Sequence, residues 1–179
     1  MHEWSLYCVV GLLGALVGSF LNVCIFRLPR GESIVWPGSH CPSCAHPIGF
    51  YDNIPILSYL WLAGRCRACC TPISARYPLV EATNALGYLA VLWYFGPTWT
   101  AALYALLFSA LVVVTGTDLT HKMIPNVITI PGVVVGLLGA VTVLPVGVIN
   151  SVAGLTVGAG ILWLLAWRSE ERRVGKECA

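Results

Sequence analysis

Three stretches of the chain contain no charged residue: Trp4–Phe26, Ala82–Thr117 and Met123–Trp167. An α-helix rises about 1.5 Å per residue, so about 20 apolar residues cross a hydrocarbon core of roughly 30 Å. The first stretch is long enough for one span. The second and third, of 36 and 45 residues, are long enough for more than one span and are interrupted at Gly96-Pro97 and Pro145. The pattern predicts five membrane-spanning helices, at residues 4–26, 78–95, 100–117, 126–144 and 147–167.

The composition supports a membrane protein. Of the 179 residues, 58% are hydrophobic and 10% are charged, and the mean hydropathy is +0.80. A soluble domain has about a quarter of its residues charged, so an ordinary soluble domain and a disordered chain are both excluded. The net charge of +2 is too small for a basic nucleic-acid-binding surface. We therefore expect an all-α polytopic membrane protein in contact with the lipid bilayer, with no nucleic-acid partner.

The basic residues predict the orientation of these spans. With five spans, one side of the membrane receives residues 27–77, the turn at 118–125 and the C-terminal end. All ten Lys and Arg residues fall in these segments, and the turns at 96–99 and 145–146 contain none. Because loops rich in Lys and Arg stay in the cytoplasm, we expect a multi-pass protein with its N-terminus outside and residues 27–77 in the cytoplasm.

Segment 27–77 carries two Cys-x-x-Cys pairs, Cys41/Cys44 and Cys66/Cys69, separated by 21 residues. Two such pairs are typical of a zinc ribbon, in which four thiolates bind one Zn²⁺ tetrahedrally. A closed four-sulfur site has no open coordination position, so its predicted role is structural. Disulfides and a redox dithiol are the alternatives, and stable disulfides are rare in the cytoplasm.

Asp118 ends the third predicted span, and Ile124-Pro125-Asn126 opens the fourth. A carboxylate at the boundary of an uncharged membrane helix is costly and is a functional candidate. The alternative is an aspartate at a helix end that is simply hydrated by cytoplasmic water. The position of Asp118 by itself does not separate these two interpretations.

Several further motifs follow in order along the chain: Gly18-Ser-Phe-Leu-Asn22-Val23, Phe26-Arg-Leu-Pro29, the two cysteine pairs, Asp52-Asn-Ile-Pro55 and Arg76-Tyr-Pro-Leu-Val-Glu81. This series resembles the N-terminal region of bacterial type IV prepilin peptidases. Asp118 with Ile124-Pro125-Asn126 resembles the first catalytic-aspartate motif of the same family.

The resemblance implies an aspartyl endopeptidase of the bacterial inner membrane. Such enzymes cleave leader peptides from type IV prepilins and type II secretion pseudopilins at the cytoplasmic face, and many N-methylate the new N-terminus with S-adenosylmethionine. It implies a catalytic role for Asp118, zinc binding by Cys41, Cys44, Cys66 and Cys69, and a role in methyl transfer for Glu81. Glu81 could instead pair with Arg76. The chain has no glycine-rich cofactor loop, so S-adenosylmethionine rests on the resemblance.

An aspartyl protease needs two carboxylates that share a proton. The second aspartate of the family lies in a Gly-x-Gly-Asp motif, which this sequence lacks, and the other aspartate of the chain is Asp52. Glu170 and Glu171 are poor substitutes because they lie in a highly charged tail. We therefore expect these 179 residues not to cleave a prepilin at a useful rate.

The tail, residues 168–179, holds seven charged residues among twelve, and we interpret it as a segment foreign to the family. The alternative is a genuine basic tail that anchors the last helix. The predicted organisation is a first transmembrane helix at 1–26, a four-cysteine zinc loop at 27–77, a partial helical peptidase core at 78–167 and the tail. Two other function classes remain open: a non-catalytic membrane scaffold with structural zinc, and a membrane thiol-disulfide carrier.

Overall fold

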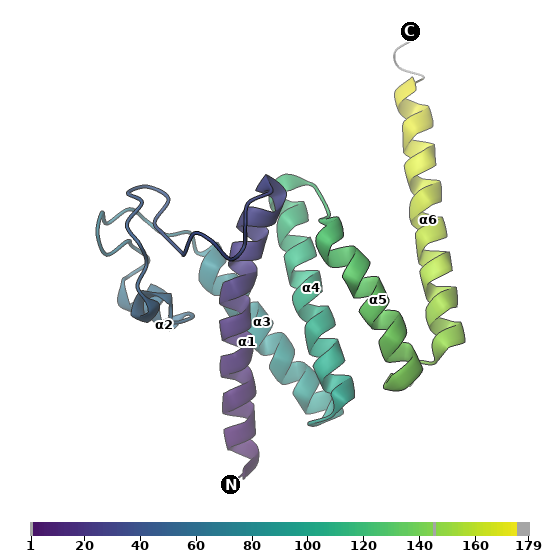
Figure 1. Ribbon diagram of the computed structural model, residues 1–179, viewed down its shortest axis with the longest axis horizontal. Coiled ribbons are helices and arrows are strands. Elements are labelled where there is room, and N and C mark those ends of the chain that lie inside the picture. Colours follow the sequence, from purple (N-terminus) through teal and green to yellow (C-terminus); the bar gives the residue numbers. More distant parts are fainter. Residues whose placement is uncertain (1, 145, 175–179) are drawn as a thin grey trace. The chain divides into compact units, whose positions relative to one another are not determined.

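The computed structural model describes residues 2–144 and 146–174, and over these residues the protein is built from helices without a β-strand. The predicted all-α class is confirmed. In chain order (Figure 1) the elements are α1 (His2–Arg27), η1 (Leu28–Arg30), η2 (Phe50–Asn53), α2 (Leu57–Trp61), α3 (Arg76–Phe95), α4 (Trp99–His121), α5 (Asn126–Thr142) and α6 (Val148–Val174). The chain divides into two compact units, Met1–Gly132 and Val133–Ala179.

The long helices correspond to the predicted spans. By length and composition, Trp4–Arg30 and Trp99–His121 are long and apolar enough to cross a membrane, and shorter apolar helices cover Asn126–Thr142 and Val148–Leu164. The remaining long helix, α3, has 20 residues, which gives a length of about 30 Å. By length and composition, these helices fit the predicted multi-helix membrane protein.

In the first unit, α1 packs against both α3 and α4. The buried apolar cluster consists of Leu21, Cys24 and Ile25 from α1 and Val113 from α4. Ile25 is completely buried. A Cβ atom on Gly116 of α4 would lie 2.5 Å from Cδ1 of Ile25, so α4 approaches the last turns of α1 closely.

The crossing of α1 and α3 depends on two glycines four residues apart. A Cβ atom on Gly14 would lie 2.8 Å from Cα of Ala85, and one on Gly18 would lie 2.7 Å from Cα of Glu81. Small residues at this spacing let two membrane helices approach at backbone distance. Polar contacts accompany the close packing. Asn84 of α3, fully buried, donates a hydrogen bond to the Gly14 carbonyl (2.8 Å) and accepts one from the Ser109 hydroxyl (3.0 Å).

The antiparallel order of α3 and α4 brings three chain segments to one end of the first unit. The end of α1, the start of α3 and the end of α4 lie toward that end. The loop of residues 31–75, hereafter the four-cysteine loop, joins α1 to α3 and extends beside the C-terminal half of α1 (Figure 1). The buried guanidinium of Arg27 holds the start of this loop, because it donates to the carbonyls of Ser33 (2.9 Å) and Gly38 (3.4 Å).

The second unit contains most of α5 and all of α6. The backbone of α6 continues to Val174 and so passes the boundary at residue 168 that the sequence suggested. Residues 175–179 of the tail lie outside the described residues, as do the side chains of Glu170 and Glu171. The foreign origin of the tail therefore stays a prediction.

Candidate functional site: a four-thiol cluster and two membrane-boundary carboxylates

The first Cys-x-x-Cys pair forms a tight backbone knuckle. The backbone N–H of Cys41 donates to the His46 carbonyl (2.9 Å), and the N–H of Ala45 donates to the Cys41 carbonyl (2.9 Å). Ala45 has a φ of 56°, the left-handed conformation that closes such a turn. A short antiparallel bridge between His40 and Pro47 closes the base of the knuckle.

The second pair repeats this geometry at equivalent positions. The backbone N–H of Cys66 donates to the Thr71 carbonyl (2.9 Å), and the backbone N–H of Cys70 donates to the Cys66 carbonyl (2.9 Å). Cys70 has a φ of 57°. The matching bridge joins Arg65 to Pro72. The two knuckles are therefore local structural repeats, and each orients two sulfurs toward one point.

The two knuckles bring four thiols together. The sulfurs of Cys41, Cys44, Cys66 and Cys69 all lie within 4.8 Å of one another, and Cys41 Sγ is 3.8 Å from Cys69 Sγ. Cys41 is buried, whereas Cys44 and Cys69 are exposed. This arrangement, hereafter the sulfur cluster, can hold a metal ion. Cys70 belongs to the knuckle backbone and is not a member of the cluster.

The protonation of the cluster is uneven. The Thr71 hydroxyl and backbone hold the pKa of Cys69 down to about 6, and backbone hydrogen bonds at Ser43 and Cys44 lower the pKa of Cys41. A backbone hydrogen bond at His46 also lowers the pKa of Cys44. Hydrogen bonds to the neighbouring sulfurs and loss of hydration outweigh it and raise this pKa to about 12. A bound cation would take the place of the shared protons, because thiolates are the metal-binding form.

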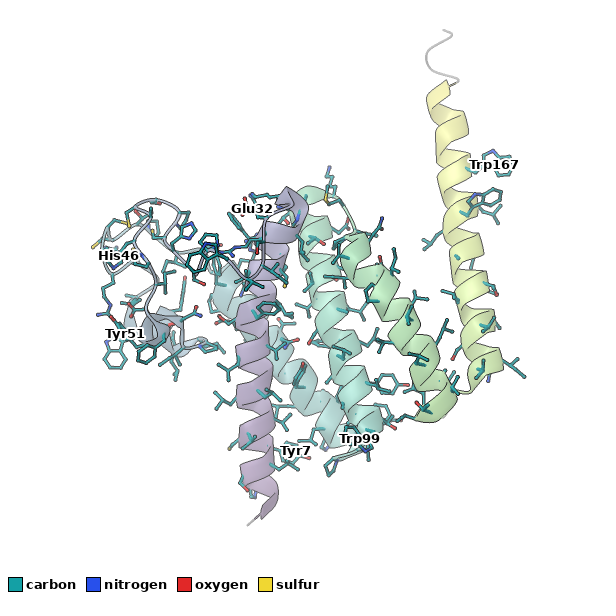
Figure 2. All side chains as sticks on the ribbon, in the orientation of Figure 1. Tyr7, Glu32, His46, Tyr51, Trp99 and Trp167 are labelled. Carbon is teal, nitrogen blue, oxygen red and sulfur yellow. The ribbon has the colours of Figure 1, made fainter. Side chains whose placement is uncertain are left out.

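An ion pair connects the second knuckle to η2. Arg67, inside the Cys66-x-x-Cys69 turn, donates from Nε (2.8 Å) and Nη2 (2.6 Å) to the carboxylate of Asp52. These hydrogen bonds lower the pKa of Asp52, so the carboxylate is charged at neutral pH. Figure 2 shows Tyr51 and His46 on the same loop. Asp52 thus has a structural partner in the loop.

Glu81 lies in the second turn of α3 and is buried, with 7% of its surface exposed. Its Oε2 accepts a hydrogen bond from the backbone N–H of Ile56 (2.8 Å). The expected alternative, an ion pair with Arg76, is not formed: in the described part of the chain, the salt bridge is that of Asp52 with Arg67.

Asp118 lies in the last turn of α4 and is exposed. The helix ends three residues later, where Lys122 adopts a φ of 52° and its N–H donates to the Asp118 carbonyl (2.8 Å). Gly116, two residues before Asp118, packs against Ile25 near the end of α1. Asp118 therefore lies at the end of the first unit that bears the four-cysteine loop. Among the side chains that the structure describes, its carboxylate makes no hydrogen bond to another side chain.

Sequence reasoning overlooked two features of this region. The cysteine pairs belong to a longer repeat, in which Pro47-Ile48 and Pro72-Ile73 follow their pairs at the same spacing. The backbone N–H of Ile48 donates to the Ser39 carbonyl (2.9 Å), and that of Ile73 donates to the Gly64 carbonyl (2.7 Å). Each acceptor lies two positions before the first cysteine of its pair. This repeat is visible in the sequence. The hydrogen bond from the Ile56 backbone to Glu81 is not visible in the sequence, because no sequence spacing links residues 56 and 81.

Comparison with known families gives two matches, in sequence order. The Bacterial Peptidase A24 N-terminal domain matches residues 12–95, which include the four-cysteine loop and Glu81. The Type IV leader peptidase family matches residues 105–175, which include Asp118. No solved structure matches the chain.

The chain is also similar to curated proteins named prepilin leader peptidase/N-methyltransferase. The protein from Aeromonas hydrophila is 39% identical over 92% of this chain and 65% of its own length. The one from Pseudomonas aeruginosa is 36% identical over 93% of this chain and 65% of its own length. The one from Myxococcus xanthus is 48% identical over 70% of this chain and 38% of its own length. The chain thus spans less than two thirds of the length of these relatives.

Proposed function

Because this chain belongs to the type IV leader peptidase family, we propose that it acts in the removal of leader peptides from type IV prepilins and type II secretion pseudopilins. The observation that carries the proposal is the pair of family matches that follow one another along the chain and include Asp118. The curated relatives carry both a peptidase and an N-methyltransferase name. The proposed substrate of this chain is accordingly a prepilin or pseudopilin that carries a leader peptide.

In this proposal Asp118 is one half of an aspartyl dyad. One carboxylate of such a pair removes a proton from the attacking water, and the other, protonated, donates to the scissile carbonyl oxygen. The exposure of Asp118 at the end of α4 supports the assignment, because water and a peptide can reach it. Its lack of a side-chain partner in the described residues leaves both carboxylate oxygens available for a second carboxyl group.

The sulfur cluster is proposed to bind Zn²⁺ in a structural role. A tetrahedral site with Zn–S bonds of about 2.3 Å places its sulfurs roughly 3.8 Å apart. The Cys41–Cys69 separation of 3.8 Å fits that value, and the other sulfurs need shift by at most about an ångström. The ion pair between Asp52 and Arg67 and the two knuckles would keep the four thiolates in position around the metal.

The proposed location is the bacterial inner membrane, with the N-terminus outside and the four-cysteine loop in the cytoplasm. The four-cysteine loop and Asp118 lie toward the same end of the first unit. This supports their location on the same side of the membrane. We retain the division into a first helix at 1–26, a zinc loop at 27–77, a peptidase core at 78–167 and a tail at 168–179. The bounds of α1 and α3 agree with it within two residues.

Methyl transfer is proposed on the names of the relatives. S-adenosylmethionine would supply the methyl group, but no described residue is assigned to it by geometry. The predicted part of Glu81 in methyl transfer stays a prediction. Its Oε2 already accepts from the Ile56 backbone, so any catalytic use of this carboxylate would have to coexist with that hydrogen bond.

The test is a prepilin cleavage assay in liposomes. The chain is compared with a version extended by the Gly-x-Gly-Asp segment of a relative, each with and without Asp118→Asn. We expect cleavage by the extended chain and a loss of about 10²-fold or more with Asp118→Asn, since general acid–base groups contribute about 10²–10⁴-fold. Glu32→Gln in the extended chain, at an exposed carboxylate outside the sulfur cluster, is the matched control and should retain cleavage.

One result would contradict the proposal, and another would contradict only the expectation that these 179 residues lack the second carboxylate. Unimpaired cleavage by the extended Asp118→Asn chain would remove Asp118 from the dyad. Cleavage by the unextended chain that depends on Asp118 would show that its partner carboxylate lies within these 179 residues. Zinc analysis of the same samples separates a structural metal site from a thiol-disulfide carrier, because a carrier would hold its thiols free for exchange.

A further inference from the structure

The four-cysteine loop contains an apolar segment that neither the metal site nor the proposed catalysis uses. Residues 54–64, Ile-Pro-Ile-Leu-Ser-Tyr-Leu-Trp-Leu-Ala-Gly, carry no charge. An apolar run of about 10–14 residues is too short to span a bilayer and is typical of a buried core helix or of a re-entrant or interfacial segment. The exposure of its side chains distinguishes these two cases.

The helix in this segment, α2, presents its apolar face outward. Leu57, Leu60 and Trp61 are 63%, 67% and 87% exposed. They stand at i, i+3 and i+4, which places them on one face of the helix. Ser58 and Tyr59 are partly buried. A helix in contact with water would show the opposite pattern, so α2 is not a core helix of a soluble loop.

The contact of Ile56 with Glu81 places the start of α2 at a depth within the span of α1. Glu81 packs by its Cα against Gly18 of α1. Gly18 lies nine residues before Arg27, the last residue of α1, which is about 14 Å along the helix axis. The Glu81 side chain points toward the start of α3. Its carboxylate is therefore closer to the level of Arg27 than Gly18 is, but it spans only part of the distance between them. In Figure 1, α2 accordingly lies level with the C-terminal half of α1 and not beyond its end.

In the irregular backbone before α2, the N–H groups of Ile56 and Leu57 both have acceptors at this depth. Ile56 has a φ of 62° and a ψ of −49°, and the N–H of Leu57 donates to the Pro55 carbonyl (2.6 Å). This is a γ-turn with positive φ, a rare and strained conformation for a branched residue. The N–H of Ile56 donates to the buried Glu81 carboxylate. Non-helical backbone is tolerated within a membrane where protein groups satisfy it in this way.

We propose that residues 54–63 are inserted into the bilayer leaflet next to the four-cysteine loop, where lipid acyl chains cover Leu57, Leu60 and Trp61. Glu81 is the positioning residue, because it holds the turn that directs α2 along α1. The sulfur cluster would then be anchored to the membrane surface at three points: the end of α1, the start of α3 and α2. The proposal depends on α1 spanning the membrane and is independent of peptidase activity.

The test compares two exposed tryptophans of the loop. Trp36, 78% exposed, lies between Ser33 and Gly38, whose carbonyls bind Arg27 at the end of α1. The full chain, Trp61→Phe and Trp36→Phe are reconstituted, without prepilin, in vesicles of phosphatidylcholine and phosphatidylglycerol. Some of these lipids carry bromine midway along the acyl chain and quench tryptophan in the hydrocarbon. Acrylamide quenches tryptophan that is in contact with water.

We expect Trp61→Phe to remove a fluorescence component that brominated lipid quenches and acrylamide does not. Trp36→Phe should remove a component that acrylamide quenches. Because Trp61 is 87% exposed, its replacement by Phe removes little packing within the protein. Acrylamide quenching of Trp61 equal to that of Trp36 would overturn the proposal. Protection of Trp61 only after a prepilin is added would also overturn it and would assign this face to the substrate.

Discussion

The carboxylates of Glu81 and Asp118 differ in their partners, although both residues lie close to the end of a long helix. Glu81 is buried and accepts from the Ile56 backbone, whereas Asp118 is exposed. A buried carboxylate with a backbone donor supports the fold, and an exposed one is available to water and substrate. Substitution of Glu81 should therefore lower the stability of the fold, and substitution of Asp118 should lower the rate of prepilin cleavage.

Replacement of Glu81 by Leu should destabilise the first unit. The substitution leaves the Ile56 N–H without an acceptor, and an unsatisfied buried donor costs about 1–3 kcal/mol. Glu81→Gln keeps a carbonyl oxygen that can accept the same hydrogen bond, so this variant should lose less stability than Glu81→Leu. Thermal unfolding in detergent, followed by circular dichroism, measures both variants. Equal losses for Gln and Leu would mean that the negative charge, and not the hydrogen bond, matters at this position.

The sulfur cluster and its neighbour Cys70 provide a second single-residue comparison. Cys41→Ser should lose bound zinc and lower the stability of the four-cysteine loop, because three thiolates hold Zn²⁺ less tightly than four. Cys70→Ser should keep both, since Cys70 lies outside the cluster. Zinc content and protease resistance of the purified variants are the measurements. A Cys41→Ser chain that lost zinc but stayed equally resistant would contradict the structural role.

The packing of α1 against α3 is an element-scale property that a single methyl group can test. Gly18→Ala would place a Cβ atom 2.7 Å from the backbone of Glu81, whereas Gly11→Ala would meet Leu89 at an ordinary 3.5 Å. Overpacking of this kind costs about 1–3 kcal/mol, so Gly18→Ala should unfold at a lower temperature and Gly11→Ala should not. Thermal denaturation of the two variants in the same detergent tests the crossing, and a tolerated Gly18→Ala would show that the helices can separate there.

The orientation of the whole molecule is testable by chemical labelling. Cysteines placed in the turn at 96–99 should react with a membrane-impermeant maleimide added outside intact cells, and a cysteine at Lys122 should react only after lysis. The expectation follows from the predicted five-span topology, in which all ten basic residues fall on the other side from this turn. The parent chain, with its own cysteines, provides the background. The reverse labelling pattern would invert the topology and would also remove the argument for a reduced sulfur cluster.

The sequence by itself was sufficient for the helices, for the four cysteines that cluster, and for the family. Long uncharged stretches predict helices because a hydrocarbon core requires internally hydrogen-bonded backbone, and the five long helices lie within a few residues of their predicted positions apart from the continuation of α6. The Cys-x-x-Cys spacing predicts its cluster because both sulfurs of a pair come from one turn, a strictly local geometry. Short-range rules of this kind can be applied to a chain before its fold is known.

Tertiary structure decided the partners of the polar groups. The hydrogen bonds of Glu81 to Ile56 and of Asn84 to Gly14 join residues 25 and 70 positions apart, and no local pattern encodes such pairings. The sequence therefore presented residues 54–64 as an ordinary part of a cytoplasmic loop. Only the approach of α1 to α3 at Gly18 places Ile56 beside the membrane span, because the depth of a loop depends on which helix surface it packs against.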